Sequence, residues 1–135
     1  MKEKPSSAIW LSRLLLFKII LLTVTTLTAI YTIYTNPERG FLAGYADAIS
    51  QNLDIIDPYS NPDYAAGYLI GKNGFLGVLT LIQLFTFNLR KRIGFWVAWI
   101  INFITLLSNG VLPILSIAIL ILGLNKSTIH FLKQK

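Results

Sequence analysis

Four apolar stretches alternate with polar segments along this chain of 135 residues. The first covers residues 12–34 and is followed by a polar segment at 36–65, and the others cover 66–89, 93–107 and 111–125. At about 1.5 Å per helical residue, the first two can cross a bilayer core of roughly 30 Å. Because lipid offers no partners to backbone N–H and C=O groups, each stretch is predicted to be helical. We therefore predict an all-α integral membrane protein, a single domain built as a bundle of four transmembrane helices.

The third and fourth apolar stretches are short, about 21–23 Å each as helices. Ser108, Asn109 and Gly110 between them are typical of a turn, so two separate crossings are predicted. These could sit in a locally thinned bilayer or be extended by snorkelling ends. The alternative is one long helix kinked near Gly110 and Pro113, which would move the final lysines to the other side of the membrane.

Basic residues concentrate on one side of the predicted bundle. Ten of the twelve Lys and Arg residues flank the apolar stretches on that side, while five of the six acidic residues fall in the opposite loop. An excess of Lys and Arg marks cytoplasmic flanks, and the run Arg90-Lys91-Arg92 is the strongest such signal. We predict a multi-pass protein of the cell (inner) membrane with both termini in the cytoplasm. Because this topology explains the net charge of +6, no nucleic-acid partner is expected.

Three cations within or beside the apolar stretches are expected to reach the membrane surfaces. Arg13 and Lys18 should extend toward the cytoplasmic headgroups, and Lys72 toward the outer interface. The four stretches contain no Asp or Glu, so the interior is predicted to hold no formal charge. That prediction weighs against a proton-coupled transporter or pump, which needs a titratable group along its path.

The outer loop contains a predicted amphipathic helix. Phe41, Tyr45, Ile49 and Leu53 recur every four residues and form one apolar stripe, with polar side chains on the opposite face. Such a helix can lie on the outer leaflet or cover the bundle as a lid. The alternative is a connector whose stripe only packs onto the rest of the protein.

Polar side chains within the spans suggest helix contacts. Thr25, Thr28 and Thr32 recur on one face of the first span, where hydroxyls can bond across an interface or to their own helix. Gln83 and Asn102 lie deep in the second and third spans and are expected to find polar partners, each other or a second protein. We predict these five residues as packing or partner contacts.

No catalytic, cofactor or metal site is predicted. The chain has no cysteine, and its one histidine, His130, lies in a basic tail. The expected function is therefore non-enzymatic: a small membrane subunit that packs helices as an accessory or assembly component of a complex, or as a homo-oligomer. The expected partners are the lipid bilayer and other membrane subunits or copies of the chain itself. The alternative is a small oligomeric transporter or channel subunit with a polar path.

Overall fold

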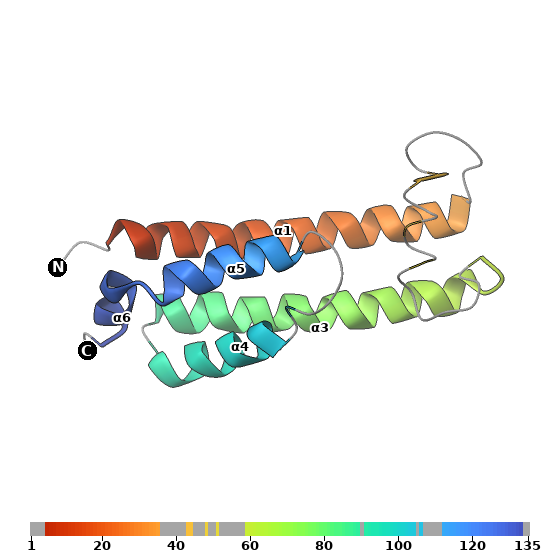
Figure 1. Ribbon diagram of the computed structural model, residues 1–135. Coiled ribbons are helices and arrows are strands. Elements are labelled where there is room, and N and C mark those ends of the chain that lie inside the picture. The colour runs from red at the N-terminus through yellow and green to blue at the C-terminus, as the bar shows by residue number, and fades with distance from the viewer. Residues whose placement is uncertain are drawn as a thin grey trace. The chain divides into compact units, whose positions relative to one another are not determined.

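The computed structural model describes residues 5–35, 43–44, 48, 51, 59–89, 91–104, 106 and 112–133, and this part of the chain is helical and contains no strand (Figure 1). Its helices are α1 (Ser6–Thr35), α3 (Pro62–Asn88), α4 (Arg92–Ile104), α5 (Leu112–Gly123) and α6 (Lys126–Lys133). The predicted all-α class is confirmed for these residues. The predicted amphipathic helix at Phe41, Tyr45, Ile49 and Leu53 lies outside the described residues.

Two of these helices, α1 and α3, are long and apolar enough to cross a membrane. A third candidate span exists only if α5 and α6 are taken together, across a break at which they bend by 65°. By itself α4 is a shorter apolar helix. The described helices therefore provide two or three candidate spans, where the sequence pattern predicts four.

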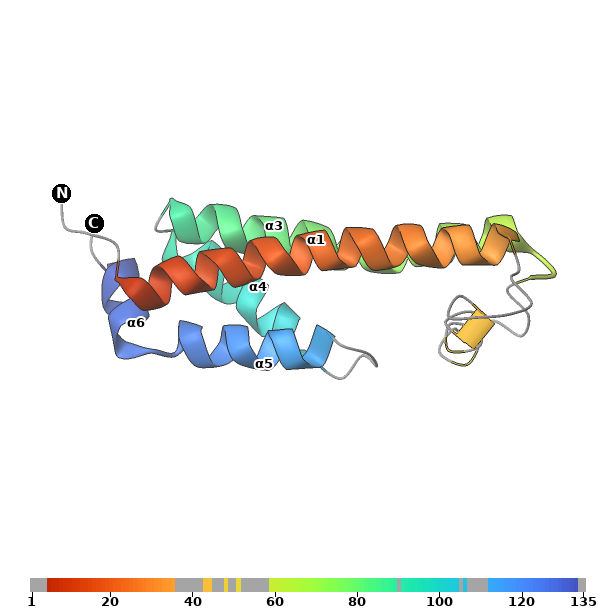
Figure 2. The same ribbon diagram turned by 90° about the horizontal axis from the view of Figure 1, so that it is seen from above.

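The chain divides into two compact units, and α1 and α3 each contribute one part to both. We call residues 1–20 with 76–135 the basic unit, and residues 21–75 the two-helix unit. In the basic unit, α4 and α5 lie beside α1 and α3, and α6 lies next to the first turn of α1 (Figures 1 and 2).

Interlocking aromatic rings form the core of the basic unit. The ring centroid of Phe87 lies 5.4 Å from that of Phe95 on α4 and 5.7 Å from that of Phe131 on α6. Aliphatic side chains from α1 and α5 complete the buried cluster, which consists of Ala8, Leu11, Leu15, Phe87, Phe95, Trp99, Ile119, Phe131 and Leu132. One core therefore holds together helices that are distant in sequence.

Helices α4 and α5 approach closely where Trp99 packs on Gly123. A Cβ atom added to Gly123 would lie only 2.4 Å from a ring carbon of Trp99. Real Cβ atoms do not approach so closely, so only glycine fits beneath the ring. Gly123 is also the last residue of α5, and the chain turns immediately after it.

The short helix α6 starts at a side-chain cap and is amphipathic. Asn125 accepts a hydrogen bond from the backbone N–H of Ser127 at 2.9 Å, which satisfies a donor at the helix start. The buried face includes Thr128, whose hydroxyl donates to Ser7 at 3.1 Å. Lys126, Lys133 and His130 lie on the exposed face. The segment expected to be a basic tail is therefore a packed helix of the basic unit, with His130 on its exposed face.

The two-helix unit has a small core between α1 and α3. Its buried residues are Ala29, Ile33, Ala65 and Leu69. Two side-chain hydrogen bonds join the helices: Asn73 donates to the hydroxyl of Thr26 at 2.8 Å, and the Tyr34 hydroxyl donates to the carboxylate of Asp63. Small alanines in the contact allow the two backbones to approach closely.

The start of α3 follows from its first residues. Asn61 accepts a hydrogen bond from the backbone N–H of Tyr64 at 3.1 Å and so caps the helix. Pro62 follows at the first helical position, where its fixed φ suits the helix and its missing N–H costs nothing. Asp63 in the first turn adds a favourable charge at the positive end of the helix dipole.

Candidate functional site

A lysine buried inside the basic unit is its most unusual feature. Lys18 on α1 is only 2% exposed, and its ammonium donates to Oδ1 of Asn102 on α4 and to Oγ of Ser116 on α5, the latter at 3.2 Å. The expectation that Lys18 extends to the headgroups is therefore wrong. The expectation of an interior without formal charge is wrong for the same reason.

The helical repeat explains why Lys18 is buried. Leu11, Leu15, Lys18 and Leu22 follow one another at spacings of four, three and four residues, and all four are buried. Residues at this spacing lie on one face of a helix. Because that face of α1 packs inward with its leucines, Lys18 points inward as well. The stripe was present in the sequence, but the position of Lys18 near the start of the span favoured snorkelling.

The two buried amides, Asn102 and Gln83, differ in their hydrogen bonds. Asn102 accepts a hydrogen bond from Lys18, and it makes none to Gln83. Gln83 on α3 is 0% exposed, and neither its amide nitrogen nor its amide oxygen has a hydrogen-bond partner within the described chain. Buried polar groups are nearly always paired, so the free amide of Gln83 requires an explanation.

Gln83 lies at nearly the same depth as Lys18. The side chains of Ser12 on α1 and Asn88 on α3 meet at 3.5 Å, which fixes the register of these antiparallel helices (Figure 1). From that point Lys18 lies six residues along α1, or about 9 Å, and Gln83 lies five residues along α3, or about 7.5 Å. Asn102 and Ser116 bind Lys18 directly, so α1, α3, α4 and α5 each contribute a buried polar side chain near this level: Lys18, Gln83, Asn102 and Ser116.

The charge of Lys18 is not balanced by any described carboxylate. Among the described residues only Asp63 is acidic, and it belongs to the two-helix unit, where it binds Tyr34. By sequence, the basic unit contains ten Lys and Arg residues and one acid, Glu3. A buried charge is expensive to desolvate, and neutral acceptors offset only part of that cost.

The threonine face of α1 bonds mainly to its own helix. The hydroxyls of Thr25, Thr28 and Thr32 donate to carbonyl oxygens one turn earlier, at 2.8, 2.9 and 2.7 Å. Thr26, outside the predicted set, bonds across to α3 by accepting from Asn73. Which residue on a helix reaches its neighbour depends on how the two faces meet, and spacing alone does not indicate this.

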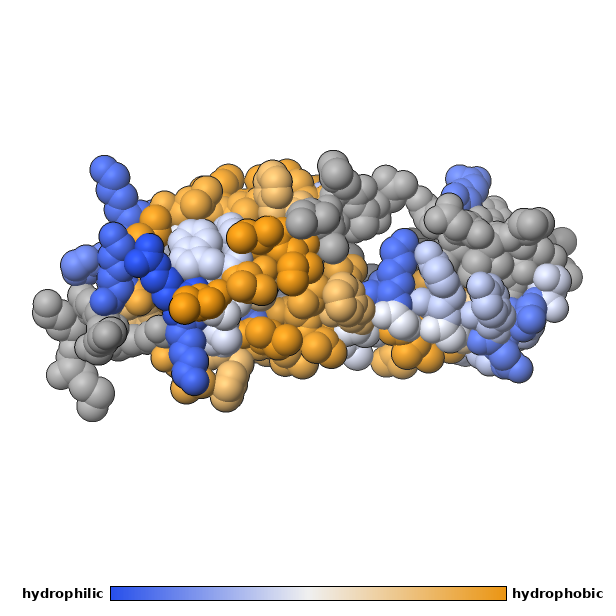
Figure 3. Space-filling model, turned by 90° about the horizontal axis from the view of Figure 1, so that it is seen from below, coloured by the Kyte–Doolittle hydropathy of each residue, from blue (hydrophilic) through white to orange (hydrophobic). Residues whose placement is uncertain are grey.

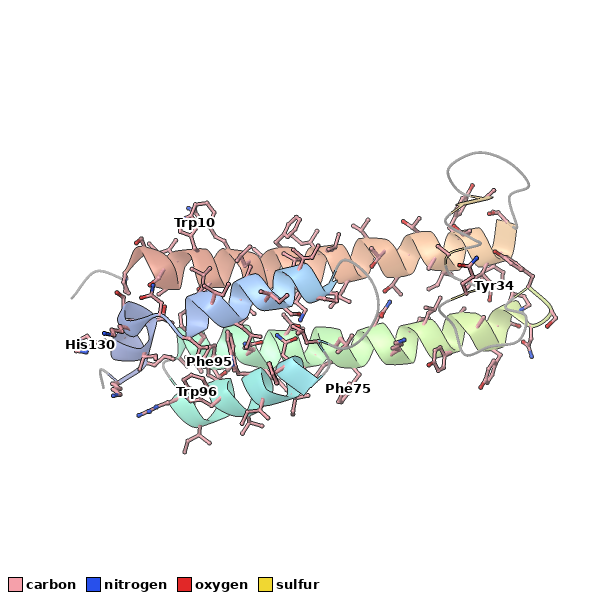
Figure 4. The ribbon with its side chains drawn as sticks, viewed as in Figure 1. Trp10, Tyr34, Phe75, Phe95, Trp96 and His130 are labelled. Atoms are coloured by element: carbon pink, nitrogen blue, oxygen red, sulfur yellow. The ribbon has the colours of Figure 1, made fainter. Side chains whose placement is uncertain are left out.

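Helix α3 has an open face of glycines. Gly67, Gly71 and Gly74 are exposed, and a Cβ atom added to any of them would meet nothing within 4 Å. Their spacing of four and three residues places them on one side of the helix, next to the exposed ring of Phe75 (Figure 4). The sequence contains the signal, since Gly67 and Gly71 form a G-x-x-x-G motif within an apolar helix.

The remaining cations and aromatic side chains lie at the surface. Of the predicted basic triplet, Lys91 and Arg92 are exposed, and Arg90 lies outside the described residues. Lys72 is exposed with its Nζ 6.0 Å from the ring centroid of Tyr68, and the guanidinium of Arg13 lies 5.4 Å from the ring of Trp10. In the basic unit, hydrophilic side chains gather at one end and an apolar surface lies beyond them (Figure 3).

Comparison with protein-family models, with curated proteins and with solved structures found no match. The helices themselves define the class of this protein: it is all-α in its described part and has two to three helices apolar enough to cross a membrane. The buried lysine and the open glycine face are the two features from which a function can be proposed.

Proposed function

We propose that this chain is a non-enzymatic integral membrane subunit that acts by helix packing, within a larger membrane complex or as a homo-oligomer. The observation that carries the proposal is the open face formed by Gly67, Gly71 and Gly74 on α3. Each glycine in a helix interior costs roughly 0.5–1 kcal/mol relative to alanine. A partner helix offsets that cost, because small residues let two backbones approach and pack without a gap.

We infer that α1 and α3 cross the inner membrane, with both chain ends on the cytoplasmic side next to the basic residues. Exposed Lys91 and Arg92, together with Arg90, act as the determinants of this orientation. The described lengths of α4 and α5 correspond to about 20 Å and 18 Å, well below the roughly 30 Å of a bilayer core. These lengths support a helical pair that enters and leaves on the cytoplasmic side, in place of the third and fourth full crossings expected from the sequence.

The proposed role of the glycine face in association can be tested by substituting larger side chains for its glycines. Replacing Gly67 and Gly71 by leucine should abolish association, measured by crosslinking in native membranes followed by gentle solubilisation and mass spectrometry. A Cβ atom added at either position meets nothing within 4 Å among the described residues, and leucine favours helix more than glycine does, so the fold should persist. Val24→Leu adds bulk to an exposed position of α1 in the same unit and should leave association unchanged. Association that survives both glycine substitutions, or a wild-type chain found only as a monomer, would contradict the proposal.

A small transporter or channel subunit is the second candidate, and one observation favours it. Lys18 supplies an intramembrane charge, and such residues commonly mark ion or substrate pathways. Against it, Lys18 is closed off from the surface and bound to side chains of its own chain. Flux of ions or solutes through liposomes that contain the purified chain would support this candidate, whereas a stable hetero-complex without flux would exclude it.

A further inference from the structure

We propose that Lys18, Gln83 and Ser116 form a binding site for a small monovalent anion, such as a halide or formate. The first argument is charge. Lys18 is buried, has neutral partners in Asn102 and Ser116, and lies in a unit whose described residues include no carboxylate. A bound anion would supply the missing countercharge where electrostatic attraction is strongest, away from water.

The second argument is the excess of hydrogen-bond donors. An ammonium has three N–H groups, and Lys18 uses two of them for Asn102 and Ser116. Ser116 accepts from Lys18 and retains its own O–H to donate, and both N–H groups of the Gln83 amide lack an acceptor within the described chain. The Oε1 atom of Gln83 is also unpaired, and the three side chains come from helices that meet at one level of the basic unit. An anion bound at this level would accept from the ammonium, the hydroxyl and the amide N–H groups.

The third argument concerns access and size. The ten Lys and Arg residues of the basic unit create a positive potential that attracts anions toward this end of the protein. The side chains around the site are closely packed, with Gln83 and Lys18 almost fully buried. We therefore restrict the proposed ligand to the smallest anions, a halide or formate, and expect a larger carboxylate such as benzoate to be excluded.

The test is a chloride titration of the purified full-length chain in phosphatidylcholine nanodiscs, followed by the line width of the ³⁵Cl NMR signal. This measurement detects weak binding as well as tight binding. We expect saturable broadening that formate reverses and benzoate does not. Lys18→Met should weaken the saturable binding by at least about tenfold, because it removes the charged donor. Lys72→Met removes an exposed lysine from α3 and should leave the binding unchanged.

A second variant keeps the test decisive if Lys18→Met does not fold. Gln83→Leu keeps Lys18 and both of its hydrogen bonds but removes the amide donors, and it should weaken chloride binding several-fold. Equal broadening in the wild type and in every folded variant of Lys18 or Gln83 would overturn the site. Absence of saturable broadening in the wild type would also overturn it. Neither result depends on the glycine face of α3, so the anion site and the proposed function can fail separately.

Discussion

At the scale of single residues, Lys18 determines how the basic unit is built. Its ammonium links α1 to α4 through Asn102 and to α5 through Ser116. A hydrogen bond to a charged donor contributes roughly 1.5–3 kcal/mol, about twice as much as a neutral one. The buried lysine therefore links three helices by hydrogen bonds, while the burial of its charge lowers the stability gained.

Removing Asn102 alone should destabilise the protein more than removing Asn102 and Lys18 together. We expect Asn102→Leu to lower the free energy of unfolding by about 2–4 kcal/mol, since it leaves a buried ammonium with one partner fewer. The double variant Lys18→Met/Asn102→Leu should recover at least about 1 kcal/mol of this loss. Unfolding by SDS in mixed micelles would measure both values. Strictly additive losses would show that the two side chains are not coupled.

At the scale of helices, the contacts between elements depend on a few close approaches. Trp99 covers Gly123 so tightly that no other residue fits at the end of α5. The opposite situation holds on α3, where Gly67 has open space around it. Gly123 thus allows a tight contact between helices, whereas Gly67 belongs to an open helix face.

Substitution of these two glycines by alanine should have opposite effects. Gly123→Ala drives a Cβ atom into a rigid indole ring, and overpacking of this kind costs about 1–3 kcal/mol. Gly67→Ala, the matched control, should stabilise α3 by up to about 1 kcal/mol, because alanine is the better helix former. Thermal denaturation in detergent, followed by circular dichroism, would show the melting temperature fall for the first and stay or rise for the second. Trp99→Leu should relieve part of the Gly123→Ala defect.

At the scale of the whole molecule, the route of α4 and α5 is the main structural question for function. Two full crossings would expose residues near Ser108 on the outer side, whereas a pair that returns to the cytoplasmic side would not. Both routes place the C-terminus in the cytoplasm, so a reporter fused after Lys135 cannot separate them.

The absence of cysteine makes a direct measurement possible. We expect Ser108→Cys to resist a membrane-impermeant maleimide added from outside intact cells. Asn61→Cys would serve as the positive control, because the residue is exposed and precedes α3 on the predicted outer side. Labelling of Ser108→Cys from outside at the rate of this control would establish four crossings and exclude the returning pair.

The sequence was sufficient for some parts of the structure and insufficient for others, for physical reasons. Apolar runs of sufficient length specify α1 and α3, because lipid forces such runs to be helical. The pairing of Asn102 could not be predicted, because it depends on which faces of α1 and α4 meet. Gly67 and Gly71 carry a local motif and could have been recognised. Lys18 was expected to reach the headgroups because it lies near the start of the span, and only the packed unit shows that it belongs to the buried stripe of α1.

The separation of Lys18 from its partners in sequence has a consequence for biosynthesis. Asn102 and Ser116 follow Lys18 by 84 and 98 residues, so neither exists when α1 first reaches the membrane. A lysine costs up to roughly 2.5–3.5 kcal/mol on the translocon scale, the value for the centre of an inserting helix, and less nearer its end. If α1 inserts as proposed, we expect its unpaired lysine to favour a shallow position during synthesis. The hydrogen bonds from α4 and α5 would then draw α1 into its final position late in assembly.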